Sequence, residues 1–478
     1  MPRVLSAFFI LLFAISSRAA EKPNIVFILA DDMGYGDLKA FNPESRIPTP
    51  HLDEFARSGI CLTDAHSGGS TCKPSRYALL TGRFAARKNN FNDNFPIIAE
   101  DRATVASMLR NNGYRTAMVG KWHLGFDRKA KRSQDGSKRL DFDYSLPLTG
   151  GPADRGFDFF FGMHASLDIQ PYFYIRNRGA TKPASNTVEA STSVGGKEGW
   201  NRIQGAFWRA GKIAPDFKFE EVTPRFADEA CGVIESHDKN KPLFLYLALP
   251  SPHTPWLPAK KFLGKSGVGM YGDFVMTVDG IVGQVLASLN KVGMRQNTLV
   301  MFSSDNGPVW YQKDVEKFGH RSVGPLRGIK GSAWEGGHRV PFIARWPGRI
   351  PAGSRNDRTI AFADVFATAA EAAGQKTIGK GAGEDSVSFL PTLLCPDQKQ
   401  EPRTPILHAG QVIRDGDWKL INTKGSRGFG ADRSKTYSIA LYNLKDDLSE
   451  QNNLASAMPE KVERLRKKLS QVMEGSDR

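Results

Sequence analysis

The chain has few cysteines for its length. Only four occur among 478 residues, at Cys61, Cys72, Cys231 and Cys395. Their separations match no zinc-binding spacing, and so small a number excludes the disulfide framework that stabilises many small secreted domains. If Cys72 has a chemical role, the other three allow at most one disulfide. The length and an apolar fraction of 40% instead predict one large α/β core with a smaller appendage.

Long hydrophobic runs are also scarce. No stretch of about 20 apolar residues follows the N-terminal region, so no stable membrane insertion is expected. Residues 1–19 combine Arg3, an apolar run over 4–15, and the small residues Ser17 and Ala19. This pattern is typical of a cleaved signal peptide and predicts an exported protein, periplasmic or secreted.

Motifs for nucleic-acid binding are missing from the sequence. The formal net charge is +15, which favours a polyanionic partner. However, no helix-turn-helix, zinc-finger spacing or aromatic RNA-binding motif occurs, so no nucleic-acid partner is expected. A basic surface without any specific partner is the alternative interpretation.

Short apolar, β-branched runs alternate with helical patterns along most of the chain. Such runs predict strands buried on both faces of a parallel sheet, at 24–30, 114–119, 242–249, 298–302 and 342–346. A further strand is expected at 60–65. Helices are expected at 51–58, 104–112, 224–236, 273–290 and 359–373, whereas 127–208 looks irregular.

A change to glycine, lysine and threonine near 374–383 marks a domain boundary. The expected organisation is a signal peptide (1–19), a catalytic α/β domain (20–375) and a C-terminal α+β subdomain (376–478). Short strands at 417–421 and 440–444 and a charged amphipathic helix at 459–473 would form the subdomain.

The segment 70–83 places a cysteine at the start of a predicted helix. Pro74 suits the first helical position and Gly82 can end the helix. Cys72 would then lie just before the helix N-terminus, with Arg76 about one turn further on. A thiol or an oxyanion would be stabilised there, although an ordinary capped helix with a small buried cysteine fits the same pattern.

Polar side chains follow four of the predicted strands. They are Asp31 and Asp32, Lys121 and His123, His253, and Asp305 and Asn306. Because ligands of open α/β sheets bind beyond the carboxyl ends of the strands, these side chains are expected to converge.

The expected cluster suits a hard cation and an anionic substrate. Its carboxylate and amide oxygens are the ligands that Ca²⁺ prefers, with Mg²⁺ as second choice, and zinc is disfavoured. Arg76, Lys121 and Lys330, the last in a glycine-framed loop, add positive charge. So much positive charge favours a substrate with a tetrahedral oxyanion.

Several motifs occur together, in this order, over about 22–455. Besides the Asp31-Asp32 pair they are Cys72-x-Pro-Ser-Arg76, Leu79-Leu-Thr-Gly-Arg83, Gly120-Lys-Trp-His-Leu-Gly125, Asp305-Asn-Gly307, Glu335-Gly-Gly-x-Arg-Val-Pro341 and Leu441-Tyr-Asn-Leu-Lys-Asp-Asp447. In combination they resemble the type I sulfatase family of the alkaline-phosphatase-like superfamily. Leu448, where many relatives have proline, is a small departure. The resemblance implies a large mixed, mostly parallel sheet sandwiched by helices, with a small C-terminal α+β subdomain.

The resemblance also implies a mechanism. A formylglycine-generating enzyme would convert Cys72 to Cα-formylglycine, which hydrates to a gem-diol. The Ca²⁺ ligands would be Asp31, Asp32, Asp305 and Asn306. One diol oxygen attacks sulfur while Arg76, Lys121 and Lys330 neutralise the sulfate oxygens. His253 would protonate the leaving alcohol, and His123 would take the proton of the second hydroxyl, which expels sulfate and restores the aldehyde.

The expected substrate is a sulfated carbohydrate, because the chain is basic and several tryptophans lie near segments that should border the site. Expected substrate-binding residues are Ser166, which the resemblance suggests, and His164, His320 and Arg321. Alternatives are an arylsulfatase acting on small aryl sulfates, a phosphate or phosphonate ester hydrolase of the same superfamily, and a non-catalytic protein that binds sulfated glycans.

Overall fold

A computed structural model gives the structure of the chain. It describes residues 22–88, 90–127, 142–201, 203–375, 379, 381–401, 403, 405–408, 412–422 and 439–474. The signal peptide expected at 1–19 lies outside the described residues.

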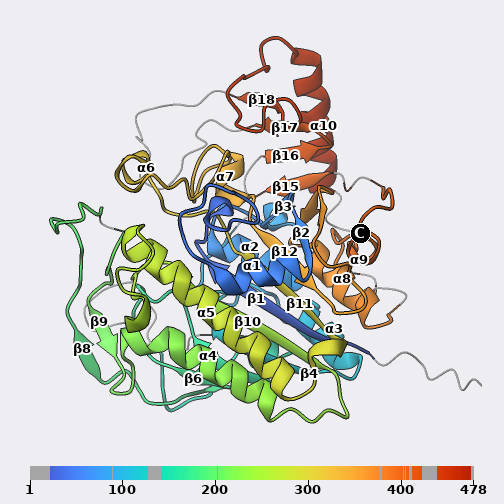
Figure 1. Cartoon of the computed structure of the whole chain (residues 1–478). Coiled ribbons are helices and arrows are strands. Elements are labelled where there is room, and N and C mark those ends of the chain that lie inside the picture. Colours follow the sequence, from blue (N-terminus) through green and yellow to red (C-terminus); the bar gives the residue numbers. More distant parts are fainter. Residues whose placement is uncertain are drawn as a thin grey trace, which may run out of the picture.

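A ten-stranded mixed sheet forms the centre of the described structure (Figure 1). Its middle contains five neighbouring parallel strands, in the order β11 (Thr298–Ser304), β1 (Asn24–Asp31), β10 (Leu243–Pro252), β4 (Arg115–Lys121) and β5 (Phe159–Met163). Every residue of β1 is buried, as expected for a strand covered on both faces.

Shorter strands, most of them in antiparallel pairs, complete this sheet at both edges. Beyond β11 lie β12 (Phe342–Arg345), β2 (Ile60–Leu62) and β13 (Ser354–Asn356), and beyond β5 lie β6 (Ile175–Arg176) and β7 (Gly179–Ala180). The pairs β11–β12, β12–β2, β5–β6 and β6–β7 are antiparallel. The predicted fold class, a mixed and mostly parallel sheet in an α/β domain, is therefore confirmed.

Helices cover both faces of the sheet. On the face toward the viewer in Figure 1, α1 (Pro50–Arg57), α4 (Phe219–Glu235) and α5 (Gly269–Lys291) pack together. The other face carries α2 (Cys72–Thr81), α3 (Val105–Asn111) and α8 (Asp364–Ala372). By length and composition α5 could span a membrane, but most of it is buried against α1, α4 and β10, which identifies it as a core helix.

A smaller antiparallel sheet and one long helix form the C-terminal subdomain, drawn in orange and red at the top of Figure 1. The strands are β15 (Ile406–His408), β16 (Val412–Asp415), β17 (Trp418–Ile421) and β18 (Ala440–Asn443), and the helix is α10 (Pro459–Glu474). Leu465 and Leu469 of α10 pack in one apolar cluster with strand residues such as Leu420. The boundary at 375/376 stays a prediction, and Phe389 and Leu393 beyond it pack into the large core.

Shorter elements connect these layers. They are α6 (Gln312–Phe318), α7 (Glu335–His338) and α9 (Leu390–Leu394), the strand pairs β3 (Ala65–His66) with β14 (Ile360–Ala361) and β8 (Asn186–Val188) with β9 (Gly211–Ile213), and 3-10 turns at Tyr35–Asp37, Ala85–Arg87, Pro152–Asp154, Lys260–Phe262 and Arg295–Asn297.

Four expected elements differ from the structure. The run 60–65 forms two strands in different sheets, because β2 pairs with β12 whereas β3 pairs with β14. The helix expected at 359–373 begins only at Asp364, after β14. Pro224 lies inside α4 rather than at its start. The supposedly irregular segment 127–208 contributes β5, which is parallel to β4, to the main sheet.

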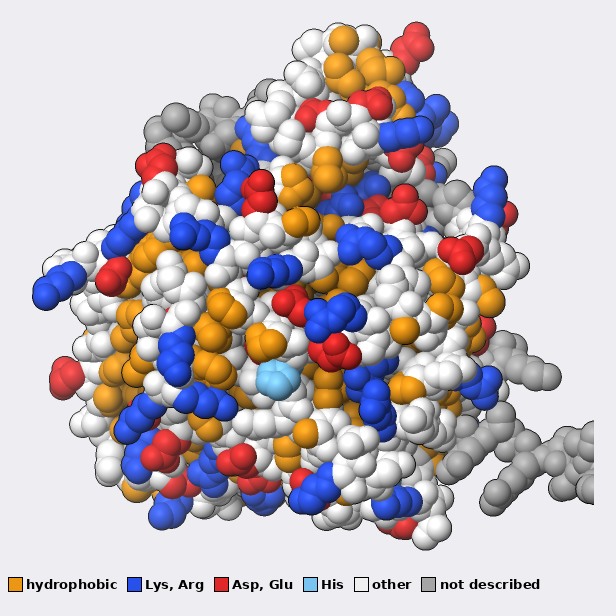
Figure 2. All heavy atoms as spheres, in the orientation of Figure 1, with side chains coloured by type: hydrophobic (Ala, Val, Ile, Leu, Met, Phe, Trp, Pro, Cys, Tyr) orange, Lys and Arg blue, Asp and Glu red, His pale blue; other side chains and the backbone are white. Residues whose placement is uncertain are grey.

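The outer surface carries charges of both signs. Figure 2 shows Lys and Arg side chains spread over one face, with Asp and Glu side chains and apolar patches between them. On this face the excess positive charge of the chain is distributed rather than gathered in one stripe.

Candidate active site

The polar residues that follow four of the parallel strands lie together at one edge of the main sheet. β11, β1, β10 and β4 are adjacent and parallel, so their carboxyl ends lie side by side. Asp31 ends β1, Lys121 ends β4, and His253 directly follows β10. The structure therefore brings these side chains together with Asp305 and Asn306, which follow β11.

Cys72 is the first residue of α2 and faces this edge. The helix begins two residues earlier than expected, and Pro74 still lies in its first turn, where its missing N–H leaves no intrahelical bond unmade. The Cys72 Sγ atom lies 3.5 Å from Asp31 Oδ1 and 3.7 Å from the Lys330 Nζ atom. Burial raises the pKa of this thiol far above its usual value, with Asp305 and Asp31 adding to the effect. The environment thus keeps an unmodified Cys72 protonated.

Arg76 lies beneath Cys72 and is fully buried. Its Nη2 atom donates to Asp305 Oδ2 at 2.9 Å and to Asp31 Oδ2 at 3.1 Å, and its Nη1 atom donates to the Lys121 carbonyl at 2.9 Å. The guanidinium group therefore fixes two carboxylates and the end of β4. It does not line the cavity described below.

Two lysines neutralise the remaining carboxylate charge. Lys121 pairs with Asp31 Oδ2 from below, and Lys330 Nζ donates to both oxygens of Asp32, at 2.5 and 2.8 Å. The Lys330 backbone N–H donates to the Pro308 carbonyl at 3.0 Å, which fixes its loop beside β11. With Arg76, the two lysines balance the formal charges of three buried carboxylates.

The oxygen atoms of this cluster suit a hard cation. Asn306 Nδ2 donates to Asp32 Oδ1 at 2.6 Å, while the buried Asn306 Oδ1 atom has no hydrogen-bond donor among the described residues. Burial and the neighbouring Asp31 raise the pKa of Asp32, and likewise raise that of Asp305 to about 6. An additional cation would relieve this repulsion and satisfy the amide oxygen. The donor set therefore fits Ca²⁺ or Mg²⁺.

Two histidines flank Cys72. His123 Nδ1 lies 3.5 Å from Ser166 Oγ, and His123 Nε2 lies 3.5 Å from an Asp93 carboxylate oxygen. His253 Nδ1 donates to the Thr254 carbonyl at 2.6 Å, which leaves Nε2 directed at Asp32, 3.7 Å away. Burial, then Lys121, lowers the pKa of His123, and burial, then Lys330, lowers that of His253 to about 4.

A cavity of about 530 Å³ opens above this cluster. Six of the residues that line it were expected at the site: Asp32, Cys72, His123, Ser166, His253 and Lys330. The cavity is also lined by residues that no sequence motif marked, namely Lys73, Phe91, Asp168 and Arg209. Lys73 could have been found from its position beside Cys72. Arg209, paired with Asp168, follows the segment expected to be irregular, where no pattern marked it.

Three expected substrate-binding residues do not line the cavity. His164 is buried with its Nε2 atom 2.9 Å from the Pro171 carbonyl, and its ring stacks on Phe173. His320 is fully buried against the Asp37 carboxylate, at 2.8 Å. Arg321 is exposed and donates to the Gly324 carbonyl. Of the four residues expected, only Ser166 reaches the cavity.

The tryptophans near the site are mostly core residues. Trp200, Trp256 and Trp310 are almost fully buried and pack against each other and Tyr271. They anchor the loops behind the cavity rather than border it.

Comparisons with known proteins identify the family of the chain. The Sulfatase family model matches residues 23–375. The chain is 32% identical to N-acetylgalactosamine-6-O-sulfatase of Bacteroides thetaiotaomicron, over 96% of this chain and 94% of that protein. It is 34% identical to arylsulfatase G of Mus musculus, over 76% of this chain and 67% of that protein.

A solved structure from Bacteroides thetaiotaomicron, described with the metabolism of multiple glycosaminoglycans, matches with a TM-score of 0.79 and 32% identity. The match covers 95% of this chain and 99% of that one. The chain therefore belongs to the sulfatase family, the sulfuric ester hydrolases of the alkaline-phosphatase-like superfamily.

Proposed function

We propose that this chain removes sulfate from a sulfated carbohydrate, with Cys72 converted to Cα-formylglycine and Ca²⁺ held by Asp31, Asp32, Asp305 and Asn306. The observation that carries the proposal is the position of Cys72. Cys72 lines the cavity, and its Sγ atom lies within 4 Å of both a carboxylate and a lysine of the charged cluster.

The charge of the cluster supports both the ion and the substrate. Three carboxylates and three cations balance each other, so a bound dication gives the site a net charge of about +2. A sulfate monoester carries one negative charge and is attracted to such a site. The ion, when bound, supplies Lewis-acid polarisation of an oxygen ligand. Mg²⁺ is the second choice because it demands a stricter octahedral geometry.

The protonated state of the Cys72 thiol supports a modified residue rather than a thiolate nucleophile. Formylglycine supplies a hydrated aldehyde whose hydroxyl groups attack sulfur without needing a thiolate. Since Cys72 is buried in the fold, the formylglycine-generating enzyme would act before α2 packs against the sheet.

The remaining residues hold charge and move protons. Lys330 faces the residue at position 72 and is suited to bind a sulfate oxygen, whereas Arg76 and Lys121 hold Asp31 and the end of β4 in place. As a hydroxyl oxygen of the residue at position 72 bonds to sulfur, the ester S–O bond breaks; the carbohydrate oxygen keeps the electron pair and takes a proton from the protonated form of His253. His123 accepts a proton from the residue at position 72 as sulfate leaves.

The substrate class rests on the cavity and on relatives. Lys73, Arg209 and Phe91 at the cavity wall offer cationic and aromatic groups that suit a sulfated sugar. Relatives include an N-acetylgalactosamine-6-O-sulfatase and arylsulfatase G, so small aryl sulfates would serve as surrogate substrates. Export to the periplasm or outside the cell, expected from residues 1–19, would bring the enzyme to sulfated carbohydrates there.

The test is sulfate release from a panel of sulfated mono- and oligosaccharides. The chain is produced with a formylglycine-generating enzyme, and conversion is measured as the mass loss of the Cys72 peptide. The expected result is release from at least one carbohydrate, dependent on conversion. Full conversion with hydrolysis of phosphate esters but of no sulfate ester would contradict the proposal.

A further inference from the structure

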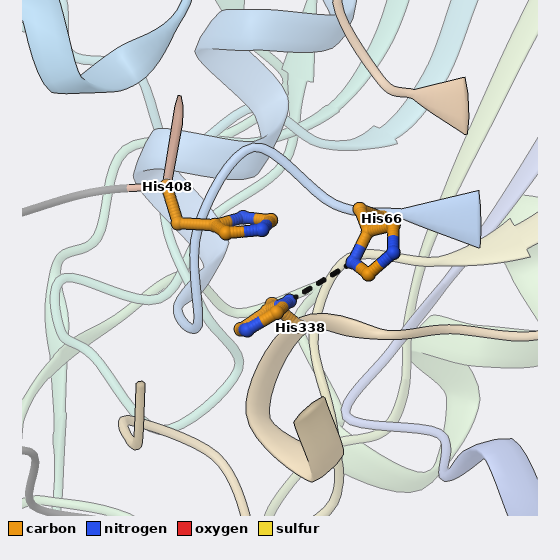
Figure 3. Close-up of side chains that lie close together, drawn as sticks. All are labelled: His66, His338 and His408. Atoms are coloured by element: carbon orange, nitrogen blue, oxygen red, sulfur yellow. Dashed lines mark hydrogen bonds between the residues drawn. The ribbon is translucent and has the colours of Figure 1, made fainter. Parts of the chain in front are cut away.

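A second group of ligand-type side chains lies outside the lining of the cavity, where the C-terminal subdomain meets the large domain. His66 ends β3, His338 ends α7 and His408 ends β15 (Figure 3). All three side chains are buried, and one ring nitrogen from each lies within 4.8 Å of the others. Three chain segments, distant in sequence, thus bring three imidazoles together.

Two of these rings already have the spacing of metal ligands. The Nδ1 atoms of His66 and His338 lie 3.1 Å apart. In a tetrahedral zinc site with bonds of 2.0–2.1 Å, ligand nitrogens are separated by about 3.3 Å. The facing pair therefore needs little movement to share an ion.

The outer nitrogens of the same rings face hydrogen-bond acceptors. His66 Nε2 lies 2.9 Å from Asp64 Oδ1, and His338 Nε2 lies 3.2 Å from the Ala333 carbonyl. When each Nε2 carries the proton, both Nδ1 lone pairs point at each other. This is how carboxylate and carbonyl groups orient metal-binding histidines.

His408 supplies the independent observation. Its side chain is 2% exposed, and neither ring nitrogen has a hydrogen-bond partner among the residues that the structure describes. Its ring stacks on His338 with centroids 3.7 Å apart. Burying an unsatisfied imidazole is costly, so a ligand that occupies one of its nitrogens would stabilise the fold.

We propose that His66, His338 and His408 bind a transition-metal ion, Zn²⁺ first, at the junction of the two domains. The His408 ring tilts out of its stack on His338 to complete the site, and the ion ties β15 to β3 and α7. Imidazole ligands suit Zn²⁺, and Cu²⁺ and Ni²⁺ compete for the same site.

The surroundings permit a dication. Asp64, Glu335 and Glu450 balance the nearby cations Arg339, Arg414 and Lys419. Burial lowers the pKa of all three histidines, so the rings are neutral and available as ligands.

A metal-free network is the opposing interpretation. Arg414 Nη1 lies 2.9 Å from His66 Nε2, and Lys419 Nζ lies 3.1 Å from His338 Nε2. If Arg414 or Lys419 donates to the Nε2 atom of one ring, that ring carries its proton on Nδ1. This Nδ1–H then donates to the Nδ1 atom of the other ring, and no ion is needed. The experiment has to separate these two states.

The test uses the full-length protein, stripped with a chelator, reloaded with excess Ca²⁺ and then dialysed against Zn²⁺. Elemental analysis is expected to find about one zinc per chain in the wild type. His408→Gln keeps the size and polarity of the side chain and is expected to bind Zn²⁺ at least about tenfold more weakly. Asp305→Asn, altered only in the proposed calcium site, is the matched control and is expected to retain zinc.

Two results would overturn the proposal: a wild type without retained zinc, or equal retention in wild type and His408→Gln. If His408→Gln does not fold, Co²⁺ replaces Zn²⁺ in the wild type. Intense visible absorption bands of four-coordinate Co²⁺ with nitrogen ligands support the site, and weak octahedral bands refute it. Neither readout depends on sulfate release, so failure of this proposal is separate from failure of the proposed function.

Discussion

The cavity and the domain junction contain charge clusters of the same formal composition. The cavity cluster comprises Asp31, Asp32 and Asp305 with Arg76, Lys121 and Lys330, and the junction cluster comprises Asp64, Glu335 and Glu450 with Arg339, Arg414 and Lys419. Each has three carboxylates and three cations in the buried interior. The number of charged groups therefore does not distinguish the proposed active site from the junction cluster.

The two clusters differ in how well their carboxylates are compensated. At the junction, cations outweigh burial and hold the pKa of Asp64 and Glu335 well below the usual range, whereas burial raises that of Glu450 to about 7. In the cavity, burial raises two of the three carboxyl pKa values and only that of Asp31 is lowered. The carboxylates of the cavity cluster are thus incompletely compensated by cations. This cluster also opens to solvent through the cavity.

The largest difference between the effects of the two clusters is expected from Cys72→Ala, which should remove activity without changing stability. Loss of the proposed nucleophile precursor is expected to reduce sulfate release by roughly 10,000-fold or more. The junction should be unaffected, so the melting temperature stays within a few degrees. The measurements are initial rates on a sulfated sugar and thermal unfolding.

Cys231→Ala, a half-buried cysteine of α4, is the matched control and should keep wild-type activity. Persistent activity in Cys72→Ala would refute the assigned nucleophile.

The next largest effect is expected from Lys419→Met. Lys419 Nζ lies 2.9 Å from both Glu335 Oε1 and Glu450 Oε1 and is fully buried. Its removal leaves two carboxylates without their shared cation, at an expected cost of about 3–5 kcal/mol in the free energy of unfolding. Urea unfolding measures this loss. Lys468→Met, which removes a partly exposed pair with Asp415, is the control and should cost less than about 1 kcal/mol.

Much of the cavity cluster was predictable because it depends on local sequence. Buried apolar runs mark β1, β4, β10 and β11, and parallel strands place the residues after their carboxyl ends at one edge. Short polar motifs directly after such strands therefore point to a site without knowledge of the tertiary packing.

The junction cluster was not predictable in this way. His66, His338 and His408 come from separate short elements, and no periodic pattern links them. The lack of a local sequence pattern also explains why β5 was not predicted and why His320 was expected at the cavity. A sequence position near a motif does not reveal whether a side chain turns toward the cavity or toward a buried partner such as Asp37.

Removal of calcium is expected to act on the cavity cluster alone. A chelator selective for Ca²⁺ should abolish activity and lower the free energy of unfolding by about 2.7 kcal/mol at a starting concentration near 100 times the dissociation constant. Ca²⁺ should restore both, and Zn²⁺ should not.

Asn306→Ala removes the unpaired amide oxygen and is expected to raise the Ca²⁺ concentration for half-maximal activity by about tenfold, or ~1.4 kcal/mol. Asn297→Ala, remote from the site, is the control. An unchanged calcium requirement in Asn306→Ala would exclude this oxygen as a ligand.

The smallest expected effect concerns charge at the cavity wall. Lys73 pairs with Asp93 at 2.9 Å, and Asp93 also lies beside His123. After burial and Lys121, Lys73 is a further cause of the lowered pKa of His123. Lys73→Met should therefore raise that pKa. Because the proposed role of His123 is that of a base, which requires its neutral form, kcat should fall at acid pH and change by less than about twofold at the optimum. The measurement is the pH profile of kcat, with Lys218→Met, an exposed lysine paired with Glu221, as the control. A shift of the acid limb to lower pH would show that Lys73 acts on this site through something other than its charge.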